Sequence, residues 1–194
     1  MNVKKTIRTL LPALSLVGAL AVYADTAPAP DDSFRVTLPT GYGAFTKQAQ
    51  VAPSPEGEIK TTNWISKSAD GSAVIVTRSE MPGKILDPQK FFDSTRESLL
   101  KSLSATLESE ERAENGASAH LLFRSPAAFF RSRFEVRDNH FYQLLYVGRS
   151  AEARTGADAA QLFDSFAIAE TPAAQPPAAA TPAVEAPAAA STTQ

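Results

Sequence analysis

The chain has 194 residues, a formal net charge of −2 and no cysteine. The missing cysteine excludes a disulfide framework, a thiol nucleophile and a cysteine metal site. The weakly acidic balance argues against nucleic-acid binding, which needs a basic surface to replace the counterions of phosphates. Two low-complexity ends leave about 140 residues between them, enough for one domain with its own hydrophobic core.

Residues 1–24 are typical of a secretory signal peptide. A basic start precedes a short apolar run over residues 10–22, and small residues follow, so we expect cleavage after Ala24. The apolar run is shorter than the about 20 residues of a membrane-spanning helix, and no cysteine follows it for acylation. The sequence therefore predicts a periplasmic or secreted protein with no transmembrane span after cleavage. The net charge then changes from −2 to −5, because three cationic side chains are removed.

Two low-complexity segments flank the expected domain, which covers residues 31–170. Residues 25–30 form a short Ala/Pro spacer, and residues 171–194 are almost entirely Ala, Pro and Thr. Alternating proline favours extended polyproline II, and this composition buries too little apolar surface to offset chain entropy. We expect tail 171–194 to be disordered. It serves either as a spacer or docking segment in the cell envelope, or as a terminus without a role.

Three strands are expected in the first half of the domain. Residues 34–38 alternate apolar and polar side chains, as a half-buried strand does. Residues 47–58 are polar and hold two prolines, which favours a loop. A turn at residues 69–72 separates two further strands, Thr61–Lys67 and Ala73–Glu80, which we expect to form a hairpin.

A long helix is predicted from Pro88 to Ser109. The carboxylate of Asp87 can accept the first free N–H groups, and proline is tolerated at the first helical position. The apolar stripe repeats at helical spacing through Phe92, Leu99, Leu103 and Leu107.

The second half of the domain is expected to add three strands and a second helix. The strands cover residues 119–123, 129–137 and 140–147, and the helix covers residues 157–166 before a short closing strand at 165–169. Strands that follow one another through tight turns form an antiparallel sheet, so the order β, ββ, α, βββ, α predicts an α+β fold.

The predicted hairpin of residues 129–147 supplies the candidate site. Pairing across Asp138-Asn139 places alternate side chains on opposite faces of the sheet. One face is apolar, while the other interleaves guanidinium groups with tyrosines. The candidate binding residues on this mixed face are Arg131, Arg133, Arg137, Tyr142 and Tyr146. They form either a patch for an anion or a protein partner, or a packed layer in which arginine stems cover tyrosine rings.

The sequence lacks the common motifs of enzymes. His120 and His140 are its two histidines, and neither stands at a zinc-ligand spacing. It holds no nucleophile elbow, phosphate-binding loop or dinucleotide-binding glycine motif. The acidic residues 108–114 lack the alternating pattern of a calcium loop, so we expect a solvated helix end there. We therefore expect no catalytic activity, no cofactor and no metal.

Three stretches of the domain resemble PsbP-like domains. The motifs are Phe34-x-Val36-x-Leu38-Pro39-x-Gly41-Tyr42, then Arg133-x4-Asp138-Asn139-x-Phe141-Tyr142-Gln143-Leu144, and Leu162-Phe163-Asp164-Ser165-Phe166. The family includes an extrinsic photosystem II subunit, a Ran-binding nuclear import factor and many secreted bacterial proteins of undefined role. The resemblance implies an αβα sandwich around a central antiparallel sheet. It assigns no site, because the family shares no catalytic residues.

These observations predict a non-catalytic binding or accessory protein of the bacterial envelope. Its expected partner is another envelope protein or a small ligand, held by the sheet face or by loops. Two alternatives stay open: a structural or stress-linked component of the envelope, and a hydrolase without a recognisable motif.

Overall fold

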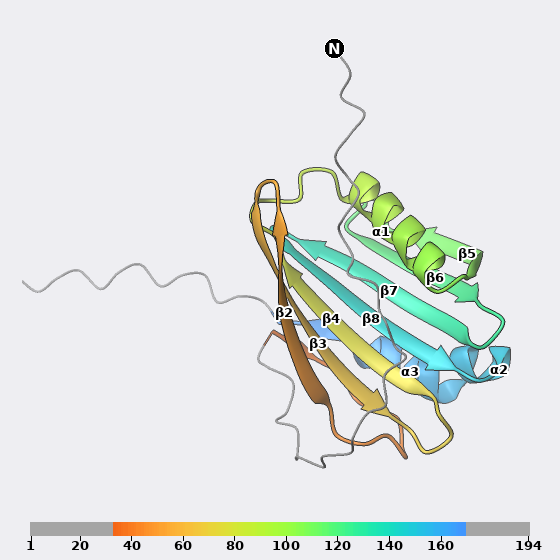
Figure 1. Ribbon diagram of the computed structural model, residues 1–194. Helices are drawn as coiled ribbons and strands as arrows, with labels where there is room; N and C mark the ends of the chain where they lie inside the picture. The colour runs from red at the N-terminus through yellow and green to blue at the C-terminus, as the bar shows by residue number, and fades with distance from the viewer. Residues whose placement is uncertain (1–32, 170–194) are drawn as a thin grey trace, which may run out of the picture.

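A computed structural model describes residues 33–169 (Figure 1). The strands are β1 Phe34–Arg35, β2 Thr46–Ser54, β3 Gly57–Lys67, β4 Ala73–Glu80, β5 Thr106–Arg112, β6 Ser118–Arg124, β7 Phe129–Arg137, β8 His140–Gly148 and β9 Ala167–Ile168. The helices are α1 Pro88–Ser102, α2 Ala151–Thr155 and α3 Ala157–Ser165.

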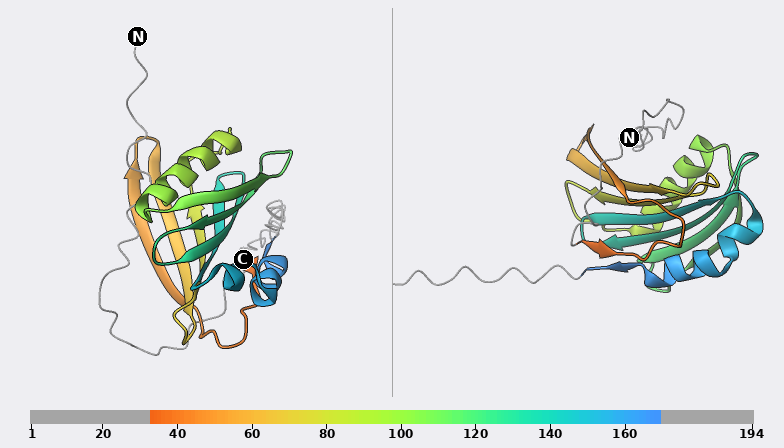
Figure 2. Two further views of the ribbon diagram at one scale, coloured as in Figure 1. Left: turned by 90° about the vertical axis from the view of Figure 1, so that its right-hand side faces the viewer. Right: turned by 90° about the horizontal axis from the view of Figure 1, so that it is seen from below.

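One large antiparallel sheet organises the described chain. It has seven strands in the order β2-β3-β4-β8-β7-β6-β5, and a separate two-stranded ribbon pairs β1 with β9. Helix α1 lies on one face of the sheet, and α2, α3 and the ribbon lie on the other (Figure 2). This arrangement confirms the predicted α+β fold with a central antiparallel sheet between helical layers.

Two apolar clusters fill the space between the layers. On one face Phe92 of α1 packs with Phe134 of the sheet. On the other face Leu162 of α3 packs with Trp64 and Leu144. Full burial of such a side chain contributes roughly 1.5–3 kcal/mol, so these clusters hold both helical layers on the sheet.

The β7–β8 hairpin has its predicted register. Asp138 takes a positive φ of 54°, which an aspartate in a tight turn tolerates. Arg137 pairs with His140, and the ladder continues without a shift to Phe129 and Gly148. The alternation of side chains therefore separates an apolar face from the arginine-bearing face, as predicted.

Residues 47–58 form strands instead of the predicted loop. β2 pairs with β3 from Thr46 opposite Ile65 to Ser54 opposite Gly57. β2 lies at the edge of the sheet and most of its side chains are exposed, so it carries no apolar alternation. Proline is tolerated on an edge strand where its missing N–H would face solvent, and this explains Pro53.

The first helix is shorter than predicted. It ends at Ser102, and Ser104 takes a φ of 49° that stops the helical path. The chain then forms β5, where Leu107 joins the same apolar cluster as α1. The spacing of four residues between Leu103 and Leu107 therefore looked like a helical repeat, although the two side chains belong to different elements.

The smaller differences lie at the ends of the domain. The opening strand covers Phe34–Arg35 only, although Val36 and Leu38 still pack against the α3 cluster. Ser150 caps an unpredicted helix, α2, by accepting a hydrogen bond from the N–H of Ala153. The predicted signal peptide 1–24, spacer 25–30 and tail 171–194 lie outside the described residues. From residue 33 to 169, no helix is long and apolar enough to cross a membrane.

Candidate functional site

The five predicted binding residues lie on the sheet face that α3 covers. Tyr142 and Tyr146 are 6% and 5% exposed, and both belong to the apolar cluster under α3. Their rings are therefore part of the core. All five residues lie on one face of the sheet. Arg131 and Arg133 pack against α3, while Arg137 and Tyr142 line one cavity and Tyr146 lines another.

Arg131 belongs to the packed layer. The central carbon of its guanidinium lies 4.3 Å from the centre of the Phe163 ring of α3. Burial lowers the pKa of Arg131, and the nearby carboxylate of Asp164 opposes this effect. Arg131 therefore makes a cation–π contact with a phenylalanine of α3, whereas the sequence predicted tyrosine rings as the partners.

Arg133 forms hydrogen bonds between the sheet and the C-terminal end of α3. One of its terminal nitrogens donates to the carbonyl oxygens of Phe163 and Phe166, both at 3.3 Å, and the other donates to Glu135. A cation is favourable there because the last carbonyls of a helix carry partial negative charge. Arg133 is thus engaged inside the protein.

Arg137 differs from the other two arginines in its exposure. Glu135 is only 7% exposed and pairs with both Arg133 and Arg137, the second at 3.6 Å. One guanidinium is enough to balance the charge of Glu135, so Arg137 brings a second positive charge. Its side chain is 49% exposed, which leaves it accessible from solvent.

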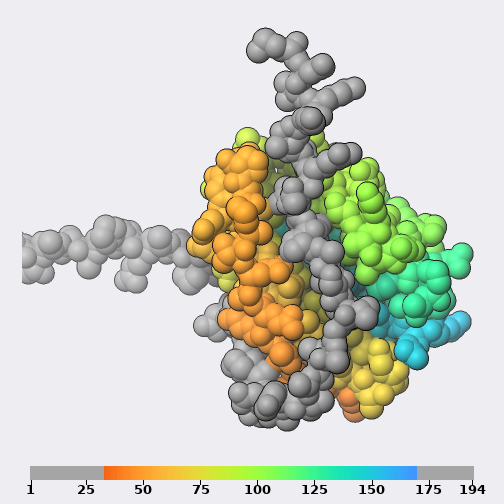
Figure 3. Space-filling view, in the orientation of Figure 1, coloured from red at the N-terminus to blue at the C-terminus, as the bar shows by residue number. Residues whose placement is uncertain are grey.

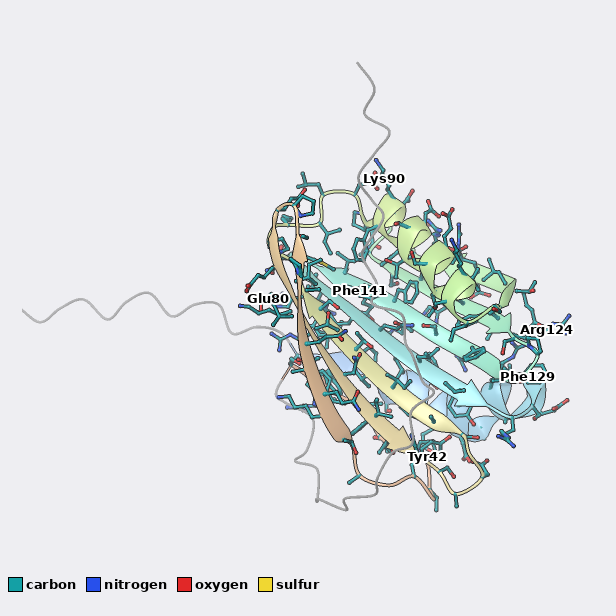
Figure 4. All side chains as sticks on the ribbon, viewed as in Figure 1. Tyr42, Glu80, Lys90, Arg124, Phe129 and Phe141 are labelled. Atoms are coloured by element: carbon teal, nitrogen blue, oxygen red, sulfur yellow. The ribbon has the colours of Figure 1, made fainter. Side chains whose placement is uncertain are left out.

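A cavity of ≈ 420 Å³ lies beside Arg137, at the turn between β7 and β8. Figure 4 labels Glu80, which pairs with His140 of β8 and therefore lies at the same end of the sheet. We call this space the hairpin cavity. Its lining residues are Arg137, Asp138, Asn139, His140, Tyr142, Ile168 and Ala169.

His140 is a cavity residue that the sequence analysis did not select. Its Nε2 lies 3.4 Å from Nη2 of Arg78 on the neighbouring strand β4. Burial, and then the positive charge of Arg78, lower the pKa of His140 from its ordinary value of 6.5. The imidazole is therefore neutral at pH 7. The predicted turn placed His140 opposite Arg137, but no local signal indicated that β4 would add a second arginine.

A second cavity, of ≈ 350 Å³, is lined by acidic residues and not by arginine. It lies near Tyr42, which Figure 4 labels at the other end of the sheet, and Tyr146 also lines it. Burial, and then the neighbouring Tyr146, raise the pKa of Tyr42 well above its ordinary value. Asp70 and Asp158 give this cavity negative charges. The hairpin cavity is therefore the better match for an anion.

Two of the acidic residues 108–114, Glu108 and Glu110, form ion pairs on strand β5, where the sequence predicted a solvated helix end. Glu108 pairs with Arg154 and, at 3.0 Å, with Arg124. Glu110 contacts Arg96 and Arg112, each at 2.5 Å. In the part of the chain that the structure describes, no three His, Asp or Glu side chains form a group that could hold a metal ion.

No family model matches this chain, and no curated protein matches it. Among solved structures, it is similar to the solution structure of PsbP (CyanoP) from the cyanobacterium Synechocystis sp. PCC 6803. The TM-score is 0.49 and the identity 13%, over 79% of this chain and 99% of that chain. A similarity of this size assigns no function, and membership of the PsbP-like family stays a prediction.

Proposed function

We propose that this protein is a non-catalytic binding protein of the bacterial envelope that holds an anionic group in the hairpin cavity. The group belongs to another envelope protein or to a small ligand. The observation that carries the proposal is the half-exposed guanidinium of Arg137, which lies at the cavity while Arg133 already balances the buried Glu135.

The charges around the cavity support an anion. Arg137 lines it directly, and Arg78 lies behind His140. Asp138 is the acidic residue of the lining, and Lys84 pairs with it at 3.4 Å. Glu80 of β4, opposite His140, adds a second carboxylate near the cavity. Arg137, Arg78 and Lys84 against Asp138 and Glu80 leave one positive charge in excess around the cavity.

The chemistry of the lining favours a carboxylate. A guanidinium offers parallel N–H donors that match the two oxygens of a carboxylate. A neutral imidazole at His140 adds a group that can donate or accept one hydrogen bond. The volume of ≈ 420 Å³ falls within the range of about 300–1,000 Å³ that small-ligand sites occupy.

Succinate is a suitable probe, because it is a small dicarboxylate. Titration followed by backbone amide NMR is expected to shift the signals of residues 137–142 and 168–169. Arg137→Gln removes the accessible positive charge and should abolish these shifts. Arg124→Gln is the matched control, since Arg124 is 61% exposed and pairs with Glu108 outside the cavity. Equal shifts in both variants, or shifts spread over the whole surface, contradict the proposal.

The same titration separates Arg137 from the packed arginines. Replacement of Arg131 and Arg133 by glutamate removes the contacts with α3. We expect a lower melting temperature for this double variant, with succinate still shifting residues 137–142 in the folded fraction. If those shifts are lost and the melting temperature is unchanged, Arg131 and Arg133 bind the anion and the packing interpretation is wrong.

The envelope location rests on the sequence of residues 1–24. Fractionation of the producing cell, followed by N-terminal sequencing, is expected to give a periplasmic or secreted chain that begins at Asp25. A cytoplasmic chain that retains Met1 would contradict this part of the proposal.

A further inference from the structure

Strand β2 is an open edge of the large sheet. Seven of its nine side chains are exposed, and Val51 is 60% exposed, a high value for a large apolar side chain. In Figure 3 the β2–β3 hairpin, in orange, forms one lateral margin of the molecule. Most side chains of β2 are therefore accessible to solvent.

The backbone direction of β2 follows from its hairpin with β3. In an antiparallel pair, residues alternate between those that exchange hydrogen bonds with the neighbour and those that point away from it. The two-residue turn makes Ser54 and Gly57 a hydrogen-bonded pair, so the even-numbered residues of β2 bond to β3. The N–H and C=O groups of Lys47, Ala49 and Val51 consequently point outward.

β2 has little of the usual protection of an edge strand. Natural edges carry charges, bulges or prolines that block pairing with another chain. β2 pairs with β3 without a bulge, and Lys47 is its one charged residue. Pro53 stands near the end of the strand, where it leaves the three outward-pointing residues intact.

We propose that two copies of this chain associate by antiparallel pairing of β2 with β2, with Ala49 on the two-fold axis. Ala49 then lies opposite the partner's Ala49, and Lys47 lies opposite the partner's Val51. Each of the three outward-pointing residues uses both its donor and its acceptor in this register. Pro53 stays outside the hydrogen-bonded pairs.

The side chains are complementary in the same register. On the opposite face of the strand from Lys47, Gln48 lies opposite the partner's Gln50, so each amide can donate to the other and accept from it. No two charges face each other, because Lys47 meets the apolar side chain of the partner's Val51. The small side chain of Ala49 allows the strands to approach closely at the axis. These features favour a second copy of the chain as the occupant of the edge.

The pairing also extends an existing row of polar side chains. Gln48 pairs with Asn63, which pairs with Thr77, which pairs with Gln143 across four neighbouring strands. Thr77 donates to Asn63 at 2.7 Å within this row. Joining two edges continues this row into a second polar row in the partner, where Gln50 pairs with Thr61 and Thr61 pairs with Ser79. The two seven-stranded sheets then become one.

Sedimentation of the full chain over a range of concentrations tests the association. We expect a monomer–dimer equilibrium that Ala49→Pro abolishes without a change in melting temperature, because the lost N–H points away from β3. A chain that stays monomeric at every concentration overturns the proposal. So does a dimer that persists in a folded Ala49→Pro variant.

A cysteine trap gives a second test that does not depend on proline. The chain has no cysteine, so Ala49→Cys introduces a single thiol at the axis. Opposed residues of an antiparallel pair lie at a Cα separation that a disulfide accepts. We expect rapid oxidation of this variant to a covalent dimer. Ser109→Cys, at an exposed position of the opposite edge strand β5, is the control, and equal rates for both variants overturn the proposal.

A charge exchange tests the register itself. Val51→Lys places a lysine opposite the partner's Lys47 at two symmetric contacts, which should weaken association about tenfold. Addition of Lys47→Glu turns both contacts into attractive pairs and should restore the dimer. Failure of the second substitution to restore it overturns the register centred on Ala49.

Discussion

The two edges of the large sheet are built in opposite ways. β5 carries a bulge between Leu107 and Ser109, and it is rich in glutamate. Ion pairs connect it to both helical layers, through Asp93 of α1 and Arg154 of α2. β2 has no bulge, and in the described sheet β3 is its one strand partner. Charged side chains and the neighbouring helices protect the β5 edge, whereas the β2 edge is available for pairing with a second chain.

The contrast implies that stability and association reside in different parts of one sheet. Substitutions on the β5 side should change the free energy of unfolding. Substitutions on β2 should leave that free energy almost unchanged and act on self-association instead. The first of three comparisons of matched variants tests this division directly, and the other two, with smaller expected effects, test the ion pairs on the β5 side.

The largest effect is expected from Phe92→Ala, which removes the anchor of α1. Phe92 is 1% exposed, and its ring lies 5.8 Å from that of Phe134. Loss of such a side chain costs about 3–5 kcal/mol through lost burial and the cavity that remains. Val51→Ala on the β2 edge should change stability by about 0.5 kcal/mol or less. Denaturant unfolding followed by Trp64 fluorescence measures both, and similar losses would contradict the division.

An intermediate effect is expected at the ion pairs of Glu108. Arg154 is 6% exposed, and it donates to the carbonyl oxygen of Phe123 at 2.9 Å and to Glu108. Arg154→Ala leaves that carbonyl without this donor, so we expect a loss of about 2–3 kcal/mol. Arg124→Ala removes the exposed partner of the same glutamate and should cost less than about 1 kcal/mol. Equal melting temperatures for the two variants would show that the burial of Arg154 does not increase the stability of the folded state.

The smallest effect is expected from Asp93→Asn, and it depends on pH. A hydrogen bond from Arg112, with the charge of Arg96, holds the pKa of Asp93 below its ordinary value of 3.8. The folded state therefore favours the charged carboxylate. Its stabilisation is present above about pH 4 and is lost as the pH falls through the folded pKa.

At pH 7 this pair should contribute less than about 1 kcal/mol, because the side chain of Asp93 is 48% exposed. Thermal melts over a pH series should show a flatter acid limb for Asp93→Asn than for the unchanged chain. Glu97→Gln, an exposed carboxylate on the same helix, serves as the control. An acid limb that Asp93→Asn does not alter would show that this pair does not hold α1 to β5.

The sequence predicted the central hairpin because its information is local. Asp138-Asn139 fixes the turn, and strict alternation then fixes which side chains share a face. The edge strands β2 and β5 were missed because an edge needs few buried side chains, so neither has an alternating apolar pattern. Their strand character comes from pairing with neighbours, which no short window of sequence displays.

The candidate site was predicted only in part for a related reason. Alternation placed the three arginines on one face, but it could not show that α3 would cover Arg131 and Arg133. The hairpin cavity combines β7 and β8 with Ile168 of β9, and Arg78 of β4 lies behind His140. These elements are distant in the sequence, so the accessible arginine becomes apparent only when the chain is folded.

The ribbon of β1 and β9 has a consequence for the connectivity of the domain. Phe34 pairs with Ile168, and the N–H of Ala169 donates to the carbonyl oxygen of Ser33 at 3.0 Å. The two ends of the described chain are therefore neighbours. A short linker can join them, and the chain can be reopened at the exposed residues 69–71 of the turn between β3 and β4, with every strand still in place. Such a circular permutant should reach the same fold, because the sheet is specified by its pairings and not by where the chain begins.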